Sequence, residues 1–90
     1  MLRITADLCS DPIVLKVEGK LRGVWVAELE HCWQRTRANC PGHRLRIELN
    51  DITFVEDRGK VLLTEMLHSG VELVATGPMM KSILEDIAAG

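Results

Sequence analysis

The sequence predicts an α/β domain with the element order β-β-α-β-α-β-α, in which a four-stranded mixed sheet carries its helices on one face. Polar and apolar residues alternate in three segments, which is the period of a strand with one buried face. Three other segments repeat their apolar residues at helical spacing. Crossover connections between parallel strands are right-handed. When each crossover adds the next strand in the same direction across the sheet, the connecting helices therefore all lie on one face. Strands covered on both faces would read as continuous apolar runs, so the alternation predicts an open second face.

The N-terminal segments predict an antiparallel hairpin. Apolar and polar residues alternate over residues 2–8 and again over residues 13–17. Residues 9–12, Cys-Ser-Asp-Pro, have the composition of a turn, and so short a connection joins neighbouring antiparallel strands. We expect Gly19 to end the second strand.

A helix is expected to follow Gly23. Trp25, Leu29 and Trp33 recur at helical spacing, and polar side chains fill the other faces. The Asn-Cys-Pro-Gly segment at residues 39–42 contains the residue types that end helices.

A third alternating segment, residues 45–49, predicts the next strand, and residues 50–55 are expected to form a short bridge with an apolar end. A second helix then begins near Asp57. Its carboxylate can accept hydrogen bonds from free backbone N–H groups and suits the positive end of the helix dipole. Gly70 is a natural C-terminal cap. The buried stripe of this helix is expected at Leu62, Leu63 and Met66.

The C-terminal part predicts a fourth strand over residues 71–76 and a last helix. This strand is the most apolar of the four, so we expect it to be the most buried. Gly77 and Pro78 turn the chain into the helix. The apolar residues of the helix, at i, i+3, i+4 and i+7, are Met80, Ile83, Leu84 and Ile87.

Composition and charge exclude several function classes. The chain has 90 residues and a formal net charge of −2, with acidic and basic residues intermixed, whereas a nucleic-acid binder needs a basic surface. No run approaches the ~18–20 apolar residues of a membrane span, and the N-terminal residues lack the pattern of a signal peptide. No linker or repeat divides the chain. We therefore expect a single domain over residues 1–90, located in the cytoplasm.

Catalytic and metal sites have little support in the sequence. Cys9, Cys32 and Cys40 are too widely spaced for a disulfide framework or a zinc site, and the three histidines are too scattered for a nucleophile–base pair. No phosphate-binding loop or nucleophile elbow is present. The sequence therefore predicts a non-catalytic domain without a metal or a cofactor.

At residues 54–59, Phe-Val-Glu-Asp-Arg-Gly, the chain resembles the STAS family, the sulfate-transporter and anti-sigma-factor-antagonist domains. In that family a strand and an apolar bridge lead to an Asp-Ser-Ser/x-Gly signature that opens a helix. Residues 19–21 resemble the Gly-x-Leu that precedes the first helix of the family, and residues 70–73 and 77–78 resemble its last strand and turn. The resemblance spans nearly the whole chain and implies the βα superhelix of these domains.

The resemblance also implies a function in protein binding. In the anti-sigma-antagonist branch, a partner kinase that is also an anti-sigma factor phosphorylates the first serine of the signature, and the phosphate weakens the complex. Asp57 stands at that phosphoacceptor position here. The implied partner is an anti-sigma factor of the serine-kinase-type ATPase class, which would dock on the loop at residues 19–23 and the first turns of the second helix. The residues expected to bind it are Lys20, Arg22, Asp57, Arg58, Lys60, Val61 and Thr64.

Asp57 has two compatible interpretations. It can cap the helix, or it can partly mimic phosphoserine, with one negative charge against the ~1.5–2 charges of a phosphate. Family members often carry an acid at the position of Arg22 and an apolar residue at the position of Lys60. Together with Arg58, these basic residues predict an ion-pair cluster around the Asp57 carboxylate. The alternative phosphorylation sites are Thr53 and Thr64.

Two other functions stay open at this point. STAS-like domains also serve as cytosolic accessory subunits of lipid-trafficking ABC transporters, where the partner is the transporter ATPase. A small-ligand sensor is the other possibility, and it would require a closed pocket near Trp25 or Trp33. The oligomeric state does not follow from the sequence.

Overall fold

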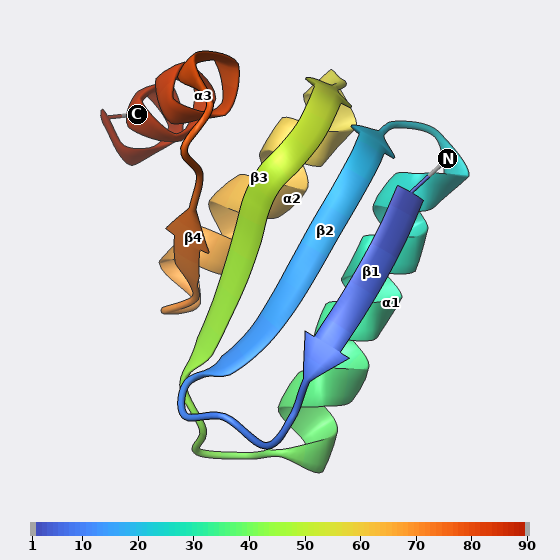
Figure 1. The fold of residues 1–90 in the computed structure, drawn as a ribbon, viewed down its shortest axis with the longest axis vertical. Coiled ribbons are helices and arrows are strands. Elements are labelled where there is room, and N and C mark those ends of the chain that lie inside the picture. The colour runs from blue at the N-terminus through green and yellow to red at the C-terminus, as the bar shows by residue number, and fades with distance from the viewer. Residues whose placement is uncertain (1, 90) are drawn as a thin grey trace.

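The computed structural model describes residues 2–89, and its element order is the predicted β-β-α-β-α-β-α (Figure 1). The elements are β1 (Leu2–Asp7), β2 (Ile13–Leu21), α1 (Val24–Asn39), β3 (Leu45–Val55), α2 (Asp57–His68), β4 (Glu72–Val74) and α3 (Pro78–Ala89).

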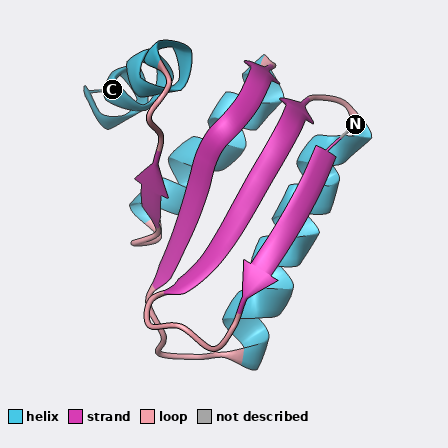
Figure 2. Ribbon diagram, viewed as in Figure 1, coloured by secondary structure: helices cyan, strands magenta, loops and turns pink. Residues whose placement is uncertain are grey.

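The four strands form one mixed sheet in the order β1-β2-β3-β4. The first two strands pair antiparallel as a hairpin, and the next two pairings are parallel. Helix α1 connects β2 to β3, and α2 connects β3 to β4. Both helices lie behind the sheet, and no helix lies in front of it (Figures 1 and 2). Helix α3 packs against α2 beside the β4 edge. The predicted α/β class and topology are confirmed.

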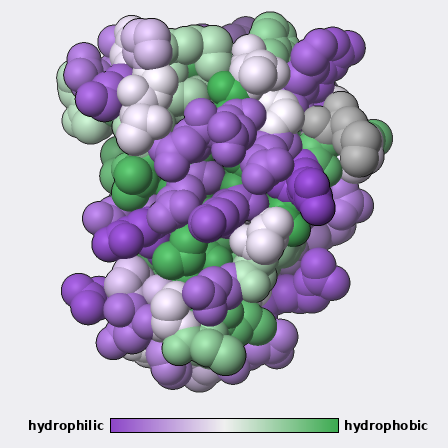
Figure 3. All heavy atoms as spheres, in the orientation of Figure 1, coloured by the Kyte–Doolittle hydropathy of each residue, from purple (hydrophilic) through white to green (hydrophobic). Residues whose placement is uncertain are grey.

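The core lies between the sheet and the helices behind it. Leu15 of β2 and Ile47 of β3 are fully buried, in the same hydrophobic cluster as Leu29 and Trp33 of α1 and Leu63 of α2. Polar residues alternate with the buried ones along both strands, so the front of the sheet is largely hydrophilic (Figure 3). The alternation in the sequence therefore identified the covered face correctly.

Two strands are longer than predicted. Strand β2 continues past Gly19 to Leu21, and β3 continues through the expected bridge to Val55. Parallel pairing extends to their ends, where Lys20 is in register with Phe54 and Leu21 with Val55. Register irregularities interrupt the pairing on the way. These irregularities break the two-residue alternation of apolar and polar residues along the strands. The alternation in the sequence therefore did not reveal that the strands continue.

Strand β4 is shorter and less buried than predicted. It spans only Glu72–Val74, and none of its three residues is buried. The strand lies at the edge of the sheet and pairs only with β3, so one of its sides has no neighbouring strand. The apolar composition of residues 71–76 reflects contact with the core from an edge position: Leu73 in the strand and Ala75 just after it are half-buried against the core.

Candidate functional site

The ends of β2 and β3 meet the start of α2 at a junction held by two hydrogen bonds. The backbone N–H of Glu56 donates to the carbonyl oxygen of Leu21 at 3.0 Å. The Glu56 side chain then reaches back, and its Oε1 accepts from the backbone N–H of Gly23 at 2.8 Å. One residue thus connects the loop before α1 to the first turn of α2. The sequence showed only an acid before the helix, which does not reveal the contact across 33 residues.

Gly59 brings α2 into direct contact with the two strand ends. A Cβ atom at this buried position would lie 2.9 Å from Cγ1 of Val55 and 3.0 Å from Cγ of Leu21. Both distances are too short for carbon atoms in van der Waals contact. The position therefore requires glycine because of close packing, and it fixes where the exposed side of α2 lies.

Asp57 is the first residue of α2 and is exposed. The prediction that Asp57 caps the helix is wrong by one position, since Glu56 is the N-cap residue and makes no side-chain capping bond. The Asp57 carboxylate still lies in the first turn, where the helix dipole stabilises a negative charge. It is accessible from solvent, as docking requires.

The predicted ion-pair cluster around Asp57 is absent. Among residues 2–89 the sole ion pair within 4.0 Å joins Arg46 to Glu72, at 2.9 Å across β3 and β4. Arg58 and Lys60 are exposed beside Asp57 without pairing to it. Long side chains lose conformational entropy when held in such pairs, and water offsets most of the Coulomb attraction. The charges are consequently available to another molecule.

The predicted α2 residues share the exposed side of the helix. Asp57, Val61 and Thr64 recur at i, i+4 and i+7 and form a row along it. Arg58 and Lys60 flank this row on opposite sides, by the same helical geometry. The Thr64 hydroxyl donates to the carbonyl oxygen of Lys60 at 2.8 Å, so its proton is already engaged within the helix.

A groove between α1 and α2 runs beside this row. It has a volume of about 320 Å³, and Arg58 and Val61 form part of its α2 wall. Val61 is 59% exposed; Val24, at the start of α1 and outside the groove lining, is 71% exposed. Val24 was not among the predicted site residues, although an apolar residue off the buried stripe of α1 was a usable signal. The remaining lining residues are Gly23, Val26, Ala27, Glu30, Leu62 and Glu65.

Two predicted residues lie apart from the α2 row. Lys20 is exposed on β2 next to buried Leu21, so strand alternation places it on the open face of the sheet. Arg22 is exposed in the loop that Glu56 holds against α2. Thr53, the other candidate phosphorylation site, donates through its hydroxyl to the carbonyl oxygen of Gly19 at 3.3 Å.

Removing the Glu56 carboxylate should loosen the loop before α1. The Gly23 N–H is exposed, so it can donate its hydrogen bond to a water molecule instead. We therefore expect Glu56→Ala to lower the free energy of unfolding by only about 1 kcal/mol. Hydrogen exchange at the Gly23 amide should accelerate. Glu56→Gln keeps an acceptor oxygen and is the matched control, with near-normal protection. Equal protection in wild type and Glu56→Ala would contradict the assignment of this bond.

Residues 2–89 contain no metal-ligand cluster and no disulfide. In residues 2–89 no three His, Cys, Asp or Glu side chains are grouped closely enough to hold a metal ion. The cysteines in this range are free thiols. None of the helices described combines the length and apolar character needed to cross a bilayer.

The architecture has a counterpart among solved structures. It is similar to the crystal structure of an uncharacterized protein of the DUF3478 family, with a SpoIIAA-like fold, from Shewanella loihica PV-4. The TM-score is 0.57 at 16% sequence identity, and the match covers 88% of this chain and 71% of the other. No family model and no curated protein matches the sequence. At this identity the similarity establishes the fold alone: the chain has a SpoIIAA-like fold.

Proposed function

We propose that this domain is a non-catalytic regulatory module that binds another protein through the docking surface formed by Arg22, Asp57, Arg58, Lys60, Val61 and Thr64. The observation that carries the proposal is the exposed Val61 at the rim of the α1–α2 groove, among charged side chains that have no ion-pair partner in residues 2–89. An apolar centre with a charged rim is the usual anatomy of a protein interface.

The charge of the docking surface indicates the chemistry of the partner. Arg22, Arg58 and Lys60 are basic and Asp57 is acidic, and the groove beside Val61 also contains Glu30 and Glu65. A partner that presents carboxylates to the three basic side chains and an apolar side chain to Val61 is complementary to this surface, and such complementarity raises specificity and association rate. Lys20 would extend the basic region at the edge of the sheet.

The fold and the resemblance of residues 54–59 support an anti-sigma factor of the serine-kinase-type ATPase class as the partner, with the domain acting in the cytoplasm. Asp57 occupies the position where a serine would be phosphorylated. Its permanent charge makes the interaction independent of that phosphorylation, because no hydroxyl is available there. Asp57→Ser would restore the acceptor and make binding sensitive to the kinase.

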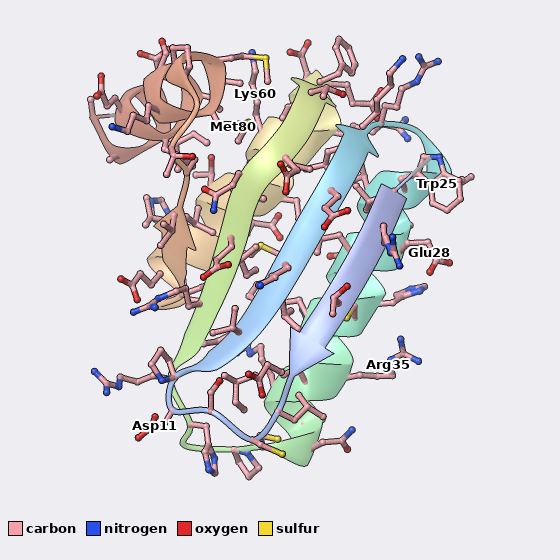
Figure 4. The ribbon with its side chains drawn as sticks, viewed as in Figure 1. Asp11, Trp25, Glu28, Arg35, Lys60 and Met80 are labelled. Carbon is pink, nitrogen blue, oxygen red and sulfur yellow. The ribbon has the colours of Figure 1, made fainter. Side chains whose placement is uncertain are left out.

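Binding measurements with matched variants test the proposal. The tagged domain is used to capture proteins from native lysate, and a captured ATPase is purified and titrated by calorimetry. We expect Val61→Asp and Arg58→Glu each to weaken binding at least about tenfold, since residues at an interface centre carry most of the affinity. Arg35→Glu is the control: Arg35 is an exposed arginine that extends from α1 away from the rest of the domain (Figure 4).

Each outcome of this experiment decides between functions. A serine-kinase-type ATPase whose binding Val61→Asp abolishes, with phosphorylation of the Asp57→Ser variant, supports the anti-sigma assignment. Capture of a transporter ATPase that binds through the same residues would support the docking surface but overturn the anti-sigma factor as the partner. Binding that responds equally to Val61→Asp and to Arg35→Glu would overturn the docking surface itself.

A further inference from the structure

A second cleft, of about 470 Å³, lies where α1 and α2 end and β3 begins. This is the lower end of the sheet in Figure 1, whereas the docking surface is at the start of α2, about 18 Å away along a 12-residue helix. Trp33 lines the cleft, and the connection from α1 to β3 forms much of its wall. The charged or titratable side chains of its lining are Arg37, His43, Arg44 and the Cys40 thiol, and none of its lining residues is acidic.

The two arginines have no anionic partner in the described chain. Within residues 2–89 neither Arg37 nor Arg44 has a carboxylate within 4.0 Å, although acidic residues outnumber basic ones in the sequence. The Arg37 guanidinium carbon lies 5.0 Å from the centroid of the Trp33 ring, a cation–π arrangement that holds the charge at the cleft wall. Arg44 is anchored by its backbone, because its carbonyl oxygen accepts from the N–H of Ile13 at 2.9 Å.

The helix dipoles explain these charges only in part. Cations are favoured at helix C-termini, and Arg37 lies in the last turn of α1. Two carbonyl groups at these helix ends already have backbone donors: the Cys40 N–H donates to the Thr36 carbonyl oxygen at 3.0 Å, and the Val71 N–H donates to the Met66 carbonyl oxygen at 3.0 Å. Arg44 lies outside any helix. The helix dipole therefore accounts for the charge of Arg37 but not for that of Arg44.

One residue of the cleft lining, Trp33, carries a buried hydrogen-bond donor without an acceptor. Trp33 is only 2% exposed, and its Nε1–H is the one buried side-chain polar group in residues 2–89 that has no hydrogen-bond partner. Buried polar groups nearly always have a partner, so each exception calls for a physical reason. A ligand oxygen bound in the cleft that Trp33 lines would be one source of such an acceptor.

We infer that this cleft binds a small oxyanion, a molecule bearing a phosphate or carboxylate group, between the guanidinium groups of Arg37 and Arg44. The planar donor fork of arginine matches the two oxygens of either group. His43, at the same wall, adds a ring N–H donor. The inference stands apart from the proposed docking function, since the two sites share no residue.

Titration of the protein with defined anions tests this site. In a Trp25→Phe background Trp33 is the only tryptophan, so its emission reports on the cleft. Inorganic phosphate and citrate are added separately, and potassium chloride at equal ionic strength is the reference; calorimetry measures the same binding without the fluorophore. We expect a saturable change in Trp33 emission with phosphate, with citrate or with both. The anion that binds more tightly shows whether the cleft prefers a phosphate or a carboxylate group.

Variants then assign the binding to the two arginines. Arg37→Gln and Arg44→Gln should each weaken the binding measured by calorimetry about tenfold, which is the loss expected for a charge-assisted hydrogen bond. Arg35→Gln is the matched control, because Arg35 is an exposed arginine of α1 outside the cleft (Figure 4). Responses no larger than that to chloride, or equal binding by all three variants, would overturn the inference.

Discussion

Ile47→Ala is expected to lower the free energy of unfolding by about 2–5 kcal/mol, because it removes a fully buried side chain from the centre of the sheet. Strand β3 pairs with β2 on one side and with β4 on the other, and Ile47, in register with Leu15 and Leu73, lies where all three strands pair. The surrounding side chains cannot collapse into the space without disturbing both pairings. For a domain of this size the loss is a large fraction of a total stability of about 5–15 kcal/mol.

Chemical denaturation of two further variants separates the cavity effect from a general sensitivity of the sheet. Ile47→Val removes one methylene group and should cost only about 0.5–1.5 kcal/mol. Lys16→Ala changes an exposed residue of β2 and should stay within about 0.5 kcal/mol of wild type. If Lys16→Ala proved as destabilising as Ile47→Ala, the assignment of one covered and one open face would be wrong.

Gly59→Ala is expected to destabilise the domain by about 1–2 kcal/mol, although alanine is the better helix former. The new Cβ would lie 2.9 Å from Cγ1 of Val55 and 3.0 Å from Cγ of Leu21, and overpacking of a core costs about 1–3 kcal/mol. The higher helix propensity of alanine relative to glycine offsets up to about 1 kcal/mol of this cost. Val55 is β-branched and the Leu21 atom is a branch point, so neither contact can be relieved at the flexible end of a side chain.

Thermal unfolding measures this effect, and Gly77→Ala is its matched control. A stability change of 1 kcal/mol shifts the midpoint of a domain this small by about 4–8 °C. A Cβ atom at Gly77 would have no other atom within 4 Å, and the backbone there is not strained, so alanine should be nearly neutral. An unchanged or higher midpoint for Gly59→Ala would show that α2 can move away from the strand ends. The docking surface would then be less rigidly placed than we describe.

The sequence predicted the fold well because its local patterns carry the information that the sheet requires. The alternation around Leu15 and Ile47 predicted which side of each strand is buried, and the composition near Asp57 predicted the start of α2. These features depend on residues within a few positions of one another. The alternation along one strand is enough to show which of its side chains are buried.

The errors lie where long-range pairing decides the outcome. Residues 50–55 read as a bridge, yet they form strand because β2 supplies hydrogen-bond partners as far as Val55. Residues 71–76 read as a buried strand, yet their place at the edge of the sheet shortens them to Glu72–Val74. Apolar composition indicates that a segment contacts the core, but it does not give the number of neighbouring strands.

For the candidate site, the sequence predicted Asp57, Val61 and Thr64 as residues of one helix, and helical spacing in α2 brings them to one side, where Asp57 and Val61 are exposed. Only the tertiary structure decided what surrounds it. The bond from Glu56 to Gly23 and the absence of ion pairs at Asp57 depend on how separate segments meet. The same holds for the oxyanion cleft, whose walls come from the ends of two helices and the start of a strand. Side-chain periodicity is a property of neighbours in the chain, whereas contacts between segments depend on the packing of the whole domain.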